Sequence, residues 1–84
     1  MSDTEANQQF WPWEMTEGRH PGTAHLAQFF DFEHLPGELQ GISSGCALVA
    51  AQMIGRLPDG PELTAGLRKL LEAKDCFVRA AVAE

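Results

Sequence analysis

The sequence predicts an all-α fold: an antiparallel helical hairpin with a short preceding helix and an irregular N-terminal arm. Two long segments, 36–57 and 61–84, repeat apolar side chains at helical spacing. The few residues between them include prolines and a glycine, and so short a connection makes neighbouring helices antiparallel. A chain of 84 residues buries only about 60 % of its unfolded surface. We therefore expect the hairpin to assemble as a homo-oligomer.

Residues 1–22 are predicted to form the irregular arm, and residues 23–84 the helical hairpin domain. The arm is polar, contains two prolines and shows no period. It also carries three aromatic residues, Phe10, Trp11 and Trp13. We expect them to pack on the body or on a neighbouring subunit. The alternatives are a contact that lies over a ligand or partner, and simple exposure.

The short helix is predicted from Ala24 to about Phe32. Thr23 precedes it as a favourable N-cap residue. The helix must end before Pro36, because the residue before a proline avoids helical angles. Its apolar side consists of Leu26, Phe29 and Phe30.

The second helix is predicted to start at Pro36, since proline is accepted in a first turn. Its apolar positions are Leu39, Ile42, Cys46, Val49, Met53, Ile54 and Leu57. Glycines at 41, 45 and 55 each cost about 1 kcal/mol relative to alanine in a helix. Either tight packing against another helix compensates this cost, or the helix breaks near residues 43–45.

Pro58, Gly60 and Pro61 predict a turn that stops the second helix and starts the third. The apolar stripe of the third helix is Leu63, Leu67, Leu70, Leu71, Phe77, Val78 and Ala81. Four-residue spacing suggests the ion pairs Arg68–Glu72 and Asp75–Arg79. The two cysteines, Cys46 and Cys76, fall on apolar sides and are expected to be buried reduced thiols.

The net charge of −6 is concentrated in residues 1–38, which hold seven acidic residues and one basic residue. This charge argues against bulk binding to DNA or RNA, which requires a broad basic surface. No apolar run approaches the about 20 residues that span a bilayer, and no signal-peptide pattern opens the chain. We therefore expect no membrane partner and a cytosolic protein.

Motifs for catalysis, metals and cofactors are absent from the sequence. It contains no GxSxG, GxGxxG, P-loop or CxxC pattern. The three histidines at 20, 25 and 34 are too scattered to suggest a metal site. The prediction is a protein that is not an enzyme and carries no metal or cofactor.

The segment Phe32-Glu33-His34-Leu35 is a first candidate for small-ligand binding. Phe32 and His34 offer flat rings, and stacking of a base on an aromatic ring contributes about 1–3 kcal/mol. His34 also offers a hydrogen bond. In the alternative interpretation, Phe32 packs in the core and His34 is a solvated turn residue.

The third helix offers further candidates. Thr64 and Arg68 lie one turn apart, with Lys69 beside them, and a hydroxyl with a guanidinium suits phosphate oxygens. The alternative is an ordinary solvated face. Lys74 interrupts the apolar stripe. It could be paired in the core, extend its ammonium to the edge, or bind phosphate at an interface.

The third helix also resembles a known family. The matching residues are Glu62-Leu63-Thr64, Leu67, Lys69-Leu70, Glu72-Ala73 and Arg79-Ala80. They are similar to the closing helix of the small anti-CBASS and anti-Thoeris helical-hairpin proteins of phages. The sequence segments HPGTAH, DFEHLP and LPDGPELT also resemble segments of small proteins from actinobacterial phages.

The resemblance implies a protein of the host cytoplasm that sequesters cyclic nucleotide messengers of bacterial immunity without cleaving them. The ligands would be cyclic di- or trinucleotides or cyclic ADP-ribose species, held between subunits of a dimer or hexamer. Phe32 or His34 would stack on a base, and Thr64 and Arg68 match a second site early on the closing helix. The other interpretation of the chain is a protein–protein adaptor that uses the Trp11/Trp13 arm or an open helix face.

Overall fold

The computed structural model describes residues 10–83, and every regular element in this range is helical. The elements in chain order are the 3-10 helix η1 (Pro12–Glu14), α2 (Pro21–Ala27), the 3-10 helix η2 (Gln28–Phe30), α3 (Gly37–Arg56) and α4 (Pro61–Val82). The all-α prediction is confirmed for this part of the chain.

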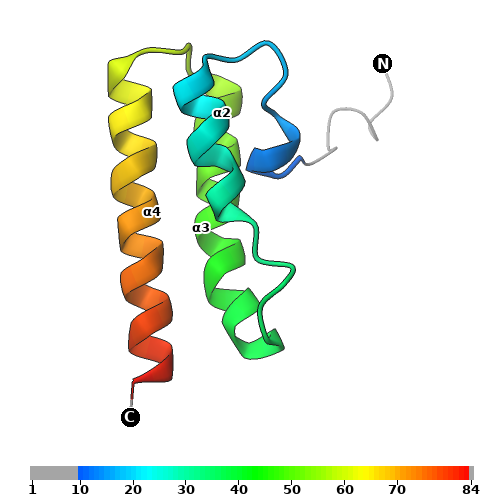
Figure 1. The fold of residues 1–84 in the computed structure, drawn as a ribbon, viewed down its shortest axis with the longest axis vertical. Helices are drawn as coiled ribbons and strands as arrows, with labels where there is room; N and C mark the ends of the chain where they lie inside the picture. Colours follow the sequence, from blue (N-terminus) through cyan, green and yellow to red (C-terminus); the bar gives the residue numbers. More distant parts are fainter. Residues whose placement is uncertain (1–9, 84) are drawn as a thin grey trace.

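Helices α3 and α4 run in opposite directions and pack against each other (Figure 1). Helix α2 packs against α4, and η1 lies on α3. The Cα atoms extend over 47 × 32 × 16 Å, so the molecule is flat. Among residues 10–83, no helix combines the length and apolar character that crossing a bilayer requires.

The core lies where α2, α3 and the first half of α4 meet. Its buried hydrophobic side chains are Leu26, Ala27, Phe30, Cys46, Ala47, Ala50, Ile54, Leu63 and Leu67. Of the stripe on α4, only Leu63 and Leu67 are buried, whereas Phe77 is 55 % exposed. The last three turns of α4 therefore leave much of their apolar side uncovered.

The short helix differs from its prediction at both ends. Helix α2 starts at Pro21, and its cap is His20, whose Nδ1 accepts from the Gly22 amide at 2.9 Å. Thr23 is buried inside the helix. The helix then tightens into η2 and ends at Phe30. Proline at the first helical position outweighs the capping preference of threonine, because its fixed φ is already helical.

Asp59, in the turn between α3 and α4, joins that turn to α2. Its carboxylate accepts from the His20 backbone amide at 3.0 Å, from Arg19 Nε at 3.1 Å and from Thr23 Oγ1 at 3.1 Å. These contacts, led by the His20 amide, lower the pKa of Asp59. Arg19 also donates to the carbonyls of Ile54 and Leu57 at the end of α3. A cation there satisfies carbonyls that the helix leaves unpaired.

The predicted arm, residues 1–22, contains η1 and the start of α2 within its described part. The Trp11 and Trp13 rings are stacked with centroids 5.7 Å apart, and both meet the Phe32 ring edge-on. These two tryptophans pack on the body as expected. Phe10 remains 46 % exposed. Residues 1–9 lie outside the described range.

Two further expectations about packing need correction. Helix α3 is continuous through residues 43–45, and within the described residues a Cβ at Gly41 or Gly45 would meet nothing within 4 Å. The small residues of α3 that are packed in the core are instead Ala47 and Ala50, which are fully buried. Cys46 is buried as predicted, but Cys76 is exposed, since none of the elements within residues 10–83 covers that turn of α4.

Candidate functional site

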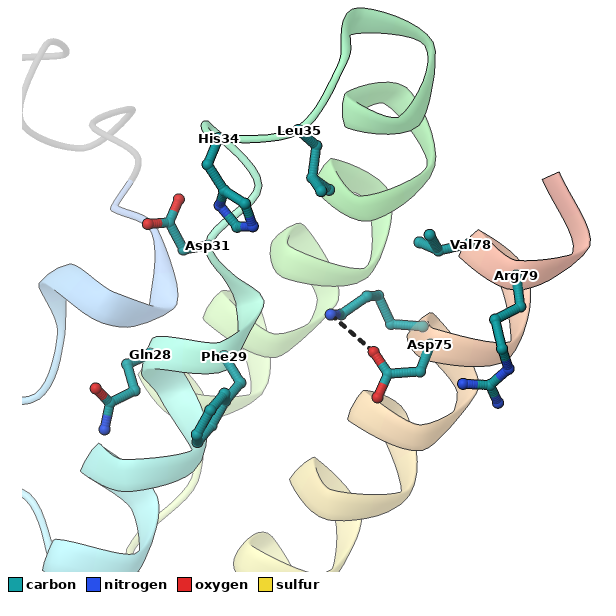
Figure 2. A pocket seen from close by; sticks show the side chains of 9 residues that line it. Gln28, Phe29, Asp31, His34, Leu35, Asp75, Val78 and Arg79 are labelled. Carbon is teal, nitrogen blue, oxygen red and sulfur yellow. Dashed lines mark ion pairs between the residues drawn. The ribbon is translucent and has the colours of Figure 1, made fainter. Parts of the chain in front are cut away.

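A cavity of about 480 Å³ lies between the segment 28–35 and the C-terminal half of α4. Figure 2 shows His34 and Leu35 on one side of it and Asp75, Val78 and Arg79 of α4 on the other. The lining residues are Gln28, Phe29, Asp31, His34, Leu35, Lys74, Asp75, Val78 and Arg79. Three of the predicted ligand-binding residues, His34, Leu35 and Lys74, therefore meet at one cavity.

Local hydrogen bonds hold the segment 31–35 in place. Asp31 Oδ1 accepts from the Glu33 amide at 3.0 Å, which closes a short turn. The Gln40 side chain, from the first turn of α3, donates to the Leu35 carbonyl at 2.8 Å and to the Glu33 carbonyl at 3.3 Å. The backbone that carries His34 is thus fixed to α3.

Lys74 brings a positive charge to the cavity wall. Its side chain is only 14 % exposed, and its Nζ contacts Asp75 Oδ1 at 2.9 Å. Burial raises the pKa of the nearby Cys46 thiol, and the charge of Lys74 opposes this rise. Most of the Lys74 side chain is thus covered, and its ammonium pairs with Asp75 at the cavity wall.

Arg79 is the second cation of this cavity, one turn beyond Asp75. Its Nη2 donates to Cys76 Sγ at 3.3 Å. The Asp75–Arg79 pair suggested by sequence spacing is not formed, because Asp75 contacts Lys74 instead. Apolar surface comes from Phe29, Leu35 and Val78. Cations beside apolar and aromatic walls suit a ligand that combines a phosphate with a flat ring.

A second cavity of about 500 Å³ lies at the start of α4. It contains Thr64 and Arg68, together with His20, Asp59, Gly60 and Pro61. Because His20 Nδ1 accepts a hydrogen bond, the neutral ring carries its proton on Nε2. Thr64 and Arg68 were predicted to act together, and the structure places them in the same cavity.

Two predicted residues lie elsewhere. Phe32 packs against Trp11 and Trp13 and lines neither of the two cavities just described. Its ring is thus engaged in the fold, as the alternative interpretation held. Lys69 is exposed and also lines neither cavity.

The sequence interpretation missed Gln28, Phe29, Asp31, Asp75 and Arg79 as lining residues of the first cavity. Phe29 was assigned to the apolar side of the short helix, yet it is 49 % exposed. An aromatic residue next to a buried one, Phe30, is the signal that could have revealed it, since adjacent helical positions face different directions.

Within residues 10–83, no group of three or more His, Cys, Asp or Glu side chains is arranged to hold a metal ion. We find no match between this chain and any protein-family model, curated protein or solved structure.

Proposed function

We propose that this protein sequesters a cyclic nucleotide messenger without cleaving it, as a phage immune-evasion protein of the host cytoplasm. The observation that carries the proposal is the convergence of His34, Leu35 and Lys74 on one cavity. These residues come from segments almost forty positions apart, and they were selected on sequence grounds alone.

The cavity offers complementary groups for such a ligand. Its volume of about 480 Å³ falls within the range of about 300–1,000 Å³ that is typical of ligand pockets. In the proposed complex, a base lies against Phe29, Leu35 and His34. A phosphate oxygen accepts from the Lys74 ammonium, with Arg79 near the next phosphate. The Thr64 and Arg68 cavity provides a second phosphate-binding site.

The proposed mechanism is stoichiometric binding. Each occupied site removes one messenger molecule from the free pool, so the effector that the messenger activates stays inactive. Tight binding, not turnover, then determines the effect. The copy number of the protein must therefore match that of the messenger.

Self-association of the α3–α4 hairpin, as a dimer or hexamer, is part of the proposal. An apolar groove of about 290 Å³ runs between the two helices and includes Met53 and Leu70. At its edge, Val49 is 42 % exposed and Leu57 is 44 % exposed. A second copy of the chain on this face would cover both. Light scattering coupled to size-exclusion chromatography should show a mass above the 9.2 kDa of one chain.

An adaptor function is the second candidate. The two tryptophans of the arm are engaged with Phe32, so they do not favour it. The groove that includes Val49 and Met53 does, because exposed apolar grooves can accept a partner helix.

Calorimetric titration against cyclic di- and trinucleotides and cyclic ADP-ribose isomers tests the proposal. We expect submicromolar binding of one class and recovery of the intact ligand. Lys74→Met should weaken binding at least about tenfold, because it removes one charged hydrogen-bond donor. Arg56→Met is a matched control, because Arg56 is exposed at the far end of α3. No binding across the panel would favour the adaptor function.

A further inference from the structure

Lys74 forms its ion pair with an unusual partner. Asp75 is its immediate neighbour in sequence, and adjacent residues of a helix do not face each other. The Asp75 carboxylate nevertheless contacts the Lys74 ammonium, and the dashed line in Figure 2 marks this ion pair. The Asp75 side chain is 48 % exposed, whereas that of Lys74 is 14 % exposed. Asp75 therefore has room to turn toward solvent, and Lys74 has little room to move.

The charges around the cavity are balanced. Lys74 and Arg79 are positive, Asp31 and Asp75 are negative, and His34 is the remaining titratable lining residue. Because the lining carries no net charge, its affinity for an anion depends on how much charge each phosphate places beside the cations and carboxylates. A phosphodiester carries a single negative charge on each phosphate, whereas a terminal phosphate carries about 1.5–2 negative charges at pH 7.

We propose that Asp75 competes with the ligand phosphate for Lys74, and that the cavity thereby selects phosphodiesters over terminal phosphates. This inference rests on the proposed function. When the ligand binds, one phosphodiester oxygen replaces Asp75 Oδ1 at the Lys74 ammonium, and the Asp75 side chain turns toward solvent. A terminal phosphate brings a further negative charge close to the two carboxylates. Linear breakdown products of a cyclic messenger are consequently bound less tightly than the cycle itself.

The test compares wild type with Asp75→Asn. The probes are a cyclic guanosine–adenosine dinucleotide and its linear form with a 5′-phosphate. Asp75→Asn should tighten binding of the cyclic probe about fivefold, the upper value for a partly exposed ion pair. Because two charges double the repulsion free energy, the gain for the linear probe should be about twenty-five-fold. Glu72→Gln is the control, an exposed acid on α4 that does not line the cavity. Equal affinities of wild type and Asp75→Asn would overturn the inference.

The proposed function and this inference fail in different ways. If neither variant binds any cyclic nucleotide, the proposed function is overturned. The charge competition is then decided by titrating both proteins with dimethyl phosphate and with methyl phosphate. The readout is the NMR shift of the backbone amide signals of residues 74–79. The competition is supported if Asp75→Asn binds both phosphates more tightly than wild type does, with the larger gain for methyl phosphate. Identical affinities of the two proteins would exclude it. Asp75→Ser serves in the same assays if the asparagine variant does not fold.

Discussion

Replacing Ser43 by alanine should make this protein more stable. Ser43 lies in the middle of α3 with only 1 % of its surface exposed. Within the described residues, its Oγ has no hydrogen-bond partner. A buried hydroxyl without a partner loses its hydrogen bonds to water on folding and regains none, which costs about 1–3 kcal/mol. Alanine fits the same space without that cost.

The expected gain follows from two contributions. Removal of the unpaired hydroxyl recovers about 1 kcal/mol at the lower end of its range. The higher helix propensity of alanine adds about 0.5 kcal/mol. We therefore expect Ser43→Ala to raise the free energy of unfolding by about 1.5 kcal/mol, which corresponds to about 6–12 °C in Tm for a domain of this size.

Thermal and urea unfolding followed by circular dichroism would measure this change, at one fixed protein concentration because self-association alters apparent stability. Ser44→Ala is the matched control. Ser44 Oγ donates to the Gly41 carbonyl at 3.2 Å, so its replacement has the same propensity gain but loses a hydrogen bond. If Ser43→Ala is no more stable than Ser44→Ala, the hydroxyl of Ser43 is not an unsatisfied group and the reasoning is wrong.

Three further predictions concern the core, the turn and the thiols. Phe30→Ala should lower the free energy of unfolding by about 3–5 kcal/mol, because the ring is fully buried; a loss below 1 kcal/mol in urea titrations would contradict its place in the core. The pKa of Asp59 lies below its ordinary value of 3.8, chiefly through the His20 amide. Its stabilising contribution is therefore present above about pH 4 and lost as pH falls through the lowered pKa. Asp59→Asn should be less stable than wild type at pH 7, and the two should converge once the pH lies below the lowered pKa of Asp59. Cys76 should react with a thiol reagent at least about tenfold faster than Cys46, which is buried and has a raised pKa; equal rates would show that Cys46 is accessible.

The candidate site was only partly predictable from the sequence. Thr64 and Arg68 share a cavity as expected because residues four apart on one helix are always neighbours. His34 and Lys74 were selected separately, and their meeting depends on where the segment 31–35 packs relative to α4. The sequence left open whether Phe32 stacks on a ligand or packs in the fold, and in the structure its ring meets Trp11 and Trp13. No local pattern indicates which of two available surfaces an aromatic ring will cover.

The sequence by itself determined the helical class, the turn at residues 57–60 and the start of α4 at Pro61. These features depend on proline, glycine and apolar spacing, which act within a few residues of the chain. Only the tertiary structure decided which polar groups share a cavity, that Cys76 is exposed, and that Asp75 contacts Lys74 rather than Arg79. These outcomes depend on how far α4 extends past its neighbours, and contacts between distant segments set that distance.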